Sequence, residues 1–161
     1  MATLVTSLVG EHRLAIDVRY VREIIRRPRI TPVPCGPANV AGLINLRGRV
    51  LTVFEMAKCL GALESEDAPE QVIIILRASG EIKGVSSHGE TGATPCQFDQ
   101  SGLLVDSIGD ITEVDESNYA PPPANLPLGK LPFVPALAEF EGKLFGVLSI
   151  EDLFAWEGLR I

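Results

Sequence analysis

The sequence predicts a mainly β fold of two small five-stranded barrels packed together, with one or two short helices. Fifteen glycines and twelve prolines among 161 residues favour many short elements joined by tight turns. Apolar and polar residues alternate over several short segments, which is typical of strands with one buried face. About ten such segments divide evenly between the two halves of the chain. Two closed barrels would leave few exposed sheet edges.

The N-terminal half is expected to hold five strands and one helical turn. Residues 4–10 and 13–18 fit a first hairpin, and residues 20–27 fit either a helix or a strand. Four prolines in residues 28–37 exclude a regular helix there. Strands are then expected over residues 43–47 and 49–54. One or two helical turns follow over residues 55–61, with Gly61 as a left-handed cap.

The C-terminal half is expected to begin after an acidic link over residues 63–70. The five apolar residues 72–76 predict a strand buried on both faces. Residues 79–101 show little periodicity and are longer than most loops. Strands are expected over residues 102–111 and 112–119, followed by an irregular proline-rich segment. A hairpin over residues 133–140 and 143–150 precedes a terminal helix, which begins at Ser149 or at Glu151-Asp152.

These elements predict one domain over residues 1–161. Residues 1–62 would form the first barrel half and residues 70–154 the second, although strands may be exchanged between the halves. Residues 82–100 contain few large apolar side chains and are interpreted as a mobile loop insertion.

Composition excludes several classes of protein. The three cysteines, Cys35, Cys59 and Cys96, form no CxxC or CxxH pattern, so we expect no metal site and a reducing compartment. No signal peptide and no apolar run of ~18 residues is present. We therefore expect a cytoplasmic protein without membrane insertion.

The charge is distributed unevenly along the chain. Residues 1–60 contain nine Lys or Arg and four acids, whereas residues 61–161 contain five Lys or Arg and seventeen acids. The net charge of −7 weakens the long-range attraction that a nucleic-acid partner would need. Either these are ordinary solvated faces, or the protein is bipolar and joins other proteins head to tail.

A Pro-x-x-Pro segment leads into Gly42-Leu43-Ile44-Asn45-Leu46-Arg47-Gly48. This segment resembles the signature of the CheW family of chemotaxis coupling proteins. The resemblance continues upstream and downstream, in family order, through LAIDV at 14–18, VREI at 21–24, GLLVDSIG at 102–109 and GVLSIEDLF at 146–154. Glu55 stands where the family usually has Asp, and residues 82–100 have no counterpart in a typical member.

The resemblance implies two SH3-like barrels, no catalytic site and no cofactor. It implies an adaptor that binds the regulatory domain of a CheA-type histidine kinase and the cytoplasmic tip of chemoreceptors, and is thereby recruited to membrane receptor arrays. Arg47 would belong to the receptor-binding region, with Glu23 close enough to pair with it bidentately. The residues implied for receptor or kinase binding are Val21, Glu23, Asn45, Arg47 and Gly48.

Alternative interpretations attach to a few residues. The arginines between 19 and 29 suggest a phosphate site, but no Gly-rich loop or interleaved aromatic residue accompanies them. Cys96 and His88 suggest a nucleophile with its base, without an evident oxyanion hole. Two rival functions also stay open. One is a small barrel that binds a ligand or carries chemistry in residues 82–100, and the other is an adaptor of a pathway that does not control motility.

Overall fold

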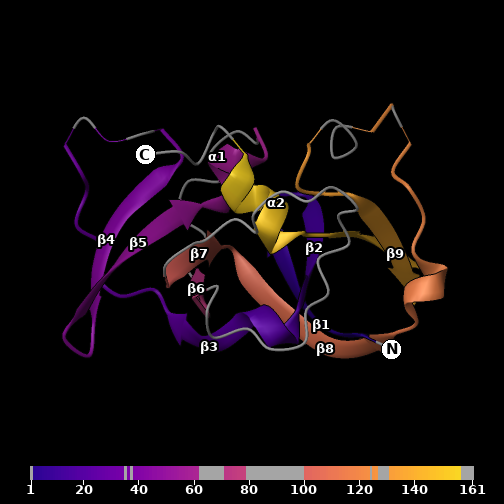
Figure 1. Cartoon of the computed structure of the whole chain (residues 1–161), viewed down its shortest axis with the longest axis horizontal. Helices are drawn as coiled ribbons and strands as arrows, with labels where there is room; N and C mark the ends of the chain where they lie inside the picture. The colour runs from indigo at the N-terminus through magenta and orange to yellow at the C-terminus, as the bar shows by residue number, and fades with distance from the viewer. Residues whose placement is uncertain are drawn as a thin grey trace, which may run out of the picture.

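Ten strands, arranged as two five-stranded sheets, make up most of the part of the chain that the structure describes (Figure 1). The structure is a computed structural model, and it describes residues 2–34, 36, 38–61, 71–78, 100–123, 125–126 and 131–156. The expected acidic link over residues 63–70 and most of the insertion over 82–100 lie outside these residues, as do Cys35, His88 and Cys96.

The first sheet combines the two ends of the chain. Its strand order is β8-β1-β2-β10-β9. All neighbours are antiparallel except β2 and β10, which run parallel. The strands are β1 (Ala2–Val9), β2 (His12–Asp17), β8 (Ser107–Val114), β9 (Ala136–Phe140) and β10 (Lys143–Val147).

The second sheet is formed by the middle of the chain. Its order is β3-β6-β7-β5-β4, and only β5 and β7 run parallel. Residues 20–27, which fitted either a helix or a strand, form a strand preceded by a 3₁₀ helix, η1 (Val18–Tyr20). The strands are β3 (Val21–Arg26), β4 (Val40–Leu46), β5 (Arg49–Glu55), β6 (Val72–Leu76) and β7 (Ser101–Val105).

The two sheets do not coincide with the two halves of the sequence. The chain begins in the first sheet, crosses to the second through η1, and returns at Asp106, between β7 and β8. Residues 1–62 therefore contribute strands to both sheets, and so do residues 70–154. This is the exchange of strands that the sequence left open.

Four strand predictions in the second half are wrong in their bounds. The hairpin predicted over 133–140 and 143–150 is shorter, because β9 and β10 span only Ala136–Phe140 and Lys143–Val147 and Ile150 already belongs to a helix. Residues 102–111 do not form one strand, because Asp106 ends the pairing of β7 and starts that of β8. The Asp106 amide donates to Leu8 O at 2.9 Å, and its carboxylate accepts from the Gly10 amide at 2.7 Å. Residues 112–119 do not form a separate strand either. β8 runs on to Val114, and Asp115 then caps a 3₁₀ helix, η3 (Glu116–Asn118), by accepting from the Ser117 amide.

Three apolar clusters form the core, one inside each barrel and one between them. Neighbouring residues of the central strands contribute to different clusters, because side chains alternate across a strand. Ile73 and Ile75 lie inside the second barrel, whereas Ile74 and Leu76 lie between the barrels. This alternation confirms that β6 is buried on both faces. The cluster between the barrels, called the seam below, includes Val5, Leu14, Ile16, Val21, Phe54, Met56, Cys59, Leu103, Phe133, Leu148, Ile150 and Leu153.

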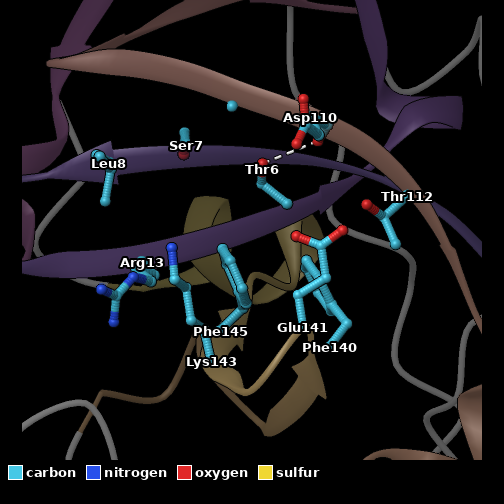
Figure 2. Close-up of a pocket in the computed structure, with 11 residues that line it drawn as sticks. Thr6, Ser7, Leu8, Arg13, Asp110, Thr112, Phe140, Glu141, Lys143 and Phe145 are labelled. Atoms are coloured by element: carbon cyan, nitrogen blue, oxygen red, sulfur yellow. Dashed lines mark hydrogen bonds between the residues drawn. The ribbon is translucent and has the colours of Figure 1, made fainter.

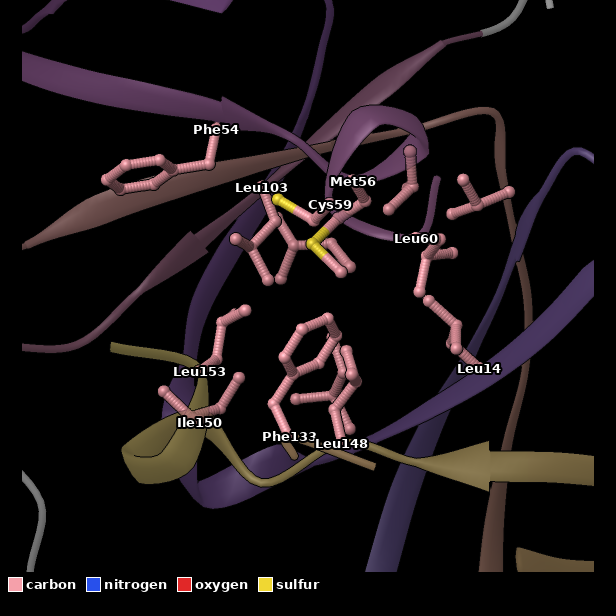
Figure 3. Close-up of a cluster of buried hydrophobic side chains, with 14 of the residues drawn as sticks. Leu14, Phe54, Met56, Cys59, Leu60, Leu103, Phe133, Leu148, Ile150 and Leu153 are labelled. Carbon is pink, nitrogen blue, oxygen red and sulfur yellow. The ribbon is translucent and has the colours of Figure 1, made fainter. Parts of the chain in front are cut away.

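Two short helices cover the seam (Figures 1 and 3). They are α1 (Met56–Cys59) and α2 (Ile150–Ala155). Gly61 adopts a left-handed φ of 69° after α1, as predicted, and Ser149 begins α2 by accepting from the Asp152 amide. Met56 and Cys59 from α1 and Ile150 and Leu153 from α2 point into the same apolar cluster. The helices therefore lock the two barrels together.

Candidate partner-binding surface

The tip of the β4–β5 hairpin carries Asn45, Arg47 and Gly48, three of the five residues for which binding roles were predicted. Leu46 pairs with Arg49, so the loop consists of Arg47 and Gly48 alone. Both have positive φ, 52° and 83°, as two-residue hairpin turns of type I′ require. Asn45 supports the turn, since its Oδ1 accepts from the Gly48 amide at 2.9 Å. The turn fixes the direction in which the Arg47 side chain leaves the hairpin.

Arg47 pairs with Glu23 in a two-point contact. Its Nη1 and Nη2 each donate to one carboxylate oxygen of Glu23, both at 2.8 Å. The predicted bidentate pair is therefore confirmed. The Arg47 side chain is 70% exposed, so most of its surface still faces solvent. The pair presents an oriented cation that a partner can approach from outside.

The contact shifts the ionisation of both groups in the directions expected for an ion pair. Hydrogen bonding to Arg47 lowers the pKa of the Glu23 carboxyl, and the nearby Arg22 charge adds to this. Hydrogen bonding to Glu23 likewise raises the pKa of the Arg47 guanidinium. Both groups are consequently charged at neutral pH.

The pair also bridges the two edges of the second sheet. Glu23 lies on β3, the first strand in the sheet order, and Arg47 extends from the tip of the hairpin whose strand β4 is the last. These edge strands are brought face to face when the sheet closes into a barrel. The ion pair therefore orients a surface that only the closed barrel creates.

Val21 lies in the core rather than at this surface. Its side chain is 8% exposed and belongs to the seam. It therefore has little area left for a partner, and an acidic substitution there would test folding more than binding, because it would bury a carboxylate. A binding role for Val21 stays a prediction.

Two exposed apolar residues of the second sheet, one on the same strand as Glu23 and one on the strand that follows Arg47, were not identified from the sequence. Ile24, next to Glu23 on β3, is 39% exposed, and Val50, at the start of β5, is 66% exposed. Apolar side chains in strands are normally expected to be buried, so the sequence did not indicate that Ile24 and Val50 would be exposed. Ile25 and Leu51, their neighbours along the chain, pack in the core of the second barrel. Ile24 and Val50 therefore face away from that core, because side chains alternate across a strand. They are the better candidates for apolar contacts with a partner.

Charge is separated between the barrels in the described part of the chain. Described residues 21–105, which form the second sheet and its connections, contain eight Lys or Arg and two acids. The described residues before 21 and after 105 contain three Lys or Arg and eleven acids. The segments 62–70 and 79–99, outside the described residues, add seven acids and one lysine. Of the eight described basic residues, only Arg22, Arg26 and Arg49 lie on strands of the second sheet, so the basic character comes from its described turns and connections as well as from its strands.

No candidate metal centre or membrane span occurs in the described part of the chain. There, no three His, Cys, Asp or Glu side chains gather in a way that would hold a metal ion, and no helix is long and apolar enough to cross a membrane.

Two packed five-stranded barrels, with an exposed ion pair at a hairpin tip, define a small mainly β protein. A sequence model of the CheW-like domain family matches residues 3–158. The chain therefore belongs to the CheW-like domain family.

Comparison with known proteins, aligned over nearly the whole chain, agrees with this family assignment. The chain is 27% identical over 154 residues to the chemotaxis protein CheW of Rhizobium meliloti, covering 96% of this chain and 88% of that protein. It is 24% identical over 161 residues to the chemotaxis protein CheW of Treponema pallidum, covering 98% and 84%. The crystal structure of the scaffolding protein TtCheW from Thermoanaerobacter tengcongensis has the same fold, with a TM-score of 0.77, 23% identity, and coverage of 99% and 97%.

Proposed function

We propose that this protein is a non-enzymatic adaptor of a bacterial chemosensory array. It joins the regulatory domain of a CheA-type histidine kinase to the cytoplasmic tip of chemoreceptors, and is held at the membrane only through these partners. Membership of the CheW-like family and two relatives named for chemotaxis support this role. The single structural observation that carries the proposal is the exposed, bidentate Glu23–Arg47 pair on a left-handed turn.

A left-handed arginine is unfavourable for the isolated chain, because a Cβ in that conformation crowds the backbone. Glu23 and Asn45 nevertheless hold the turn and its side chain in place. Residues in sparsely populated conformations tend to occur where geometry serves a function. Because the Arg47 guanidinium already donates two hydrogen bonds to Glu23, its side chain is held in one orientation. Less side-chain entropy is therefore lost when it binds a partner.

In this proposal the five residues have different tasks. Arg47 and Glu23 contact the receptor, while Asn45 and Gly48 shape the turn that presents Arg47. Val21 fixes β3 to the seam and thereby positions Glu23. Ile24 and Val50 supply apolar contact area around the ion pair, since apolar side chains at the centre of an interface contribute most of its affinity.

Reconstitution with native partners tests the function directly. Receptors in membranes and the kinase are combined with and without this protein, and phosphorylation is measured as receptor ligand is added. We expect kinase activity to respond to receptor ligand only when the protein is present. An equal response in its absence would exclude the adaptor role.

Surface variants then locate the receptor contact. Ile24→Ser and Val50→Ser should each weaken receptor coupling while binding to the kinase regulatory domain persists. Ile111→Ser is the matched control, because Ile111 is a similarly exposed strand residue of the first sheet, 64% exposed. Equal effects of all three changes would show that the surface around Glu23 and Arg47 is not special.

A further inference from the structure

The buried core of the first barrel contains more small side chains than that of the second. Its buried core residues include three alanines, Ala2, Ala15 and Ala138. The buried core residues of the second barrel are all Ile, Leu or Val. Small side chains fill less of a barrel of the same strand number, and the mouths of such barrels are common sites for small ligands.

A cleft of about 150 Å³ opens at the mouth of the first barrel. All five strands of the first sheet contribute to its lining (Figure 2). Phe140 and Phe145 provide an aromatic wall, since their rings stack with centroids 4.1 Å apart and planes 6° from parallel. Thr6, Leu8 and Thr112 line it from β1 and β8. The cleft therefore combines an apolar surface with hydroxyl groups.

The shape of the cleft is fixed by its strands. Thr6 Oγ1 donates to Asp110 O at 2.8 Å, which ties β1 to the irregular part of β8. Gly109 allows this approach, because a Cβ at that position would lie 2.5 Å from Thr6 Oγ1. A site on strands that are held in this way needs little rearrangement to bind a ligand.

Charged side chains of opposite sign stand on opposite sides of the cleft. Arg13 and Lys143 lie on one side in Figure 2, and Asp110 and Glu141 lie on the other. No salt bridge joins these four side chains to one another in the described part of the chain. The mouth thus presents a positive and a negative side separated by the phenyl rings.

We propose that this cleft binds a free amino acid with an apolar side chain. The carboxylate of such a zwitterion would face Arg13 and Lys143, and its ammonium group would face Asp110 and Glu141. Its side chain would lie against Phe140 and Phe145. The volume suits a ligand of this size, and the arrangement matches both charges at once. The four charged residues are exposed, so the affinity is weak, with a Kd of about 1 mM.

The site is separate from the proposed adaptor surface. It lies in the first sheet, whereas Glu23 and Arg47 lie in the second. A test of ligand binding therefore neither requires the kinase nor depends on the adaptor role.

Amide NMR of the full chain tests the proposal with L-leucine as the probe. Titration to roughly 20 mM, well above the expected Kd, should shift the amides of Gly109, Asp110, Gly142 and Phe145. 4-Methylpentanoate lacks the ammonium group and leucinamide lacks the carboxylate. Each should bind about three- to ten-fold more weakly than leucine, the difference expected for the loss of exposed charge contacts. Equal binding of leucine and 4-methylpentanoate would overturn the zwitterion assignment in favour of a simple anion site.

Two variants and a control connect binding to the cleft. Thr112→Phe should abolish binding by filling the cleft from β8, where an aromatic residue suits a strand. Asp110→Asn should weaken binding about three-fold. Glu113→Gln is the matched control, because Glu113 is an exposed acid on the same strand that does not line the cleft, and it should bind leucine normally.

Two other results would also overturn the proposal. One is the absence of leucine-induced shifts in the wild-type protein. The second is a Thr112→Phe protein that keeps a native spectrum but no longer binds the kinase, in a case where the wild-type protein shows no leucine-induced shifts. That second result would assign the mouth to a protein partner instead.

Discussion

Arg47 is one of two residues other than glycine with positive φ in the described part of the chain, and Glu141 is the other. Each precedes a glycine at the tip of a two-residue hairpin. The two differ in what their side chains do. Arg47 is bound at both terminal nitrogens by Glu23, whereas Glu141 stands at the rim of the cleft in the first barrel. The same type of two-residue turn therefore presents a cationic side chain in the second sheet and an anionic side chain in the first.

Exchanging the charges of the pair separates its role in binding from its role in stability. Glu23→Arg and Arg47→Glu should each weaken receptor coupling, and the double exchange should restore the pair itself without restoring native coupling. Exposed ion pairs contribute little to folding, so melting temperatures should change little in all three variants. Thermal melts and reconstituted kinase assays provide the measurements. Native coupling in the double variant would show that the pair only supports the fold.

The pair should also respond to acid in a defined direction. The pKa of Glu23 is lowered in the folded protein. Its contribution is therefore complete above the unfolded pKa and is lost as the pH falls through the lower, folded value. Receptor binding that depends on the pair should persist at pH 5 and decline only below about pH 4, the ordinary range of a Glu carboxyl.

Ser7 and Thr6 are adjacent buried hydroxyl residues of β1 with opposite hydrogen-bonding states. Thr6 donates to Asp110 O, whereas Ser7 Oγ is buried without a hydrogen-bond partner among the described residues. Ser7→Ala should leave stability unchanged or raise it by about 1 kcal/mol, because an unsatisfied polar group is removed. Thr6→Val should lower stability by about 1 kcal/mol. Urea unfolding of both variants checks this, and a loss in Ser7→Ala as large as that in Thr6→Val would contradict it.

At the scale of elements, the two hairpin tips offer a matched comparison. Gly48 and Gly142 have φ of 83° and 74°, and a Cβ at either would meet no other atom within 4 Å. Alanine should therefore cost roughly 1 kcal/mol at each, from backbone conformation alone.

Only one of these changes should affect coupling. Gly48→Ala should impair receptor coupling because it disturbs the turn that orients Arg47. Gly142→Ala should lose similar stability with coupling intact. Thermal unfolding and the reconstituted kinase assay distinguish the effects, and equal coupling defects would attribute both to stability rather than to presentation of Arg47.

The helices over the seam are short, and their apolar residues matter more than their length. Phe133 is fully buried beneath them, with its ring centroid 5.0 Å from that of Trp156. Phe133→Ala should lower the free energy of unfolding by about 3–5 kcal/mol. Denaturant unfolding measures this loss. A loss below about 1 kcal/mol, the range of surface substitutions, would show that the barrels do not depend on the seam.

At the scale of the whole molecule, charge separation is expected to act on association. The described second sheet is basic and the described first sheet is acidic. If the basic sheet meets an acidic kinase surface, complementary charge mainly accelerates association. Binding to the kinase regulatory domain should weaken as salt rises toward ~0.5 M, where the screening length is a few Å.

Neutralising exposed arginines should test which sheet is responsible. Arg26→Gln with Arg29→Gln should reduce the dependence of the association rate on salt. Arg13→Gln, in the first sheet, is the control and should leave that dependence unchanged. A salt dependence that does not change in the second-sheet variant would assign the attraction to other residues.

Local pattern was enough to predict most elements. Alternating apolar residues located β1, β2, β5 and β10, and Gly61 and Ser149 marked helix ends through their backbone and capping chemistry. The Gly42–Gly48 motif, read as a family resemblance, also led to the Glu23–Arg47 pair. The strands and helix ends depend on residues close together in the sequence, and the ion pair was predicted from a family motif that includes the hairpin turn.

Pairing across the fold was decided only by tertiary structure. The break between β7 and β8 at Asp106 depends on hydrogen bonds to the β1–β2 hairpin, nearly a hundred residues away. Apolar periodicity alone therefore predicted one continuous strand across Asp106. The burial of Val21 and the exposure of Ile24 and Val50 depend on which strands lie beside them. The sequence by itself determined where most of the strands lie, because that follows from local apolar patterning, but it left residues 20–27 ambiguous and misplaced the strand ends between 102 and 119. Which strands share a sheet, which charges share a surface and where a cleft forms depend on contacts between distant segments, and these contacts exist only once the chain has folded.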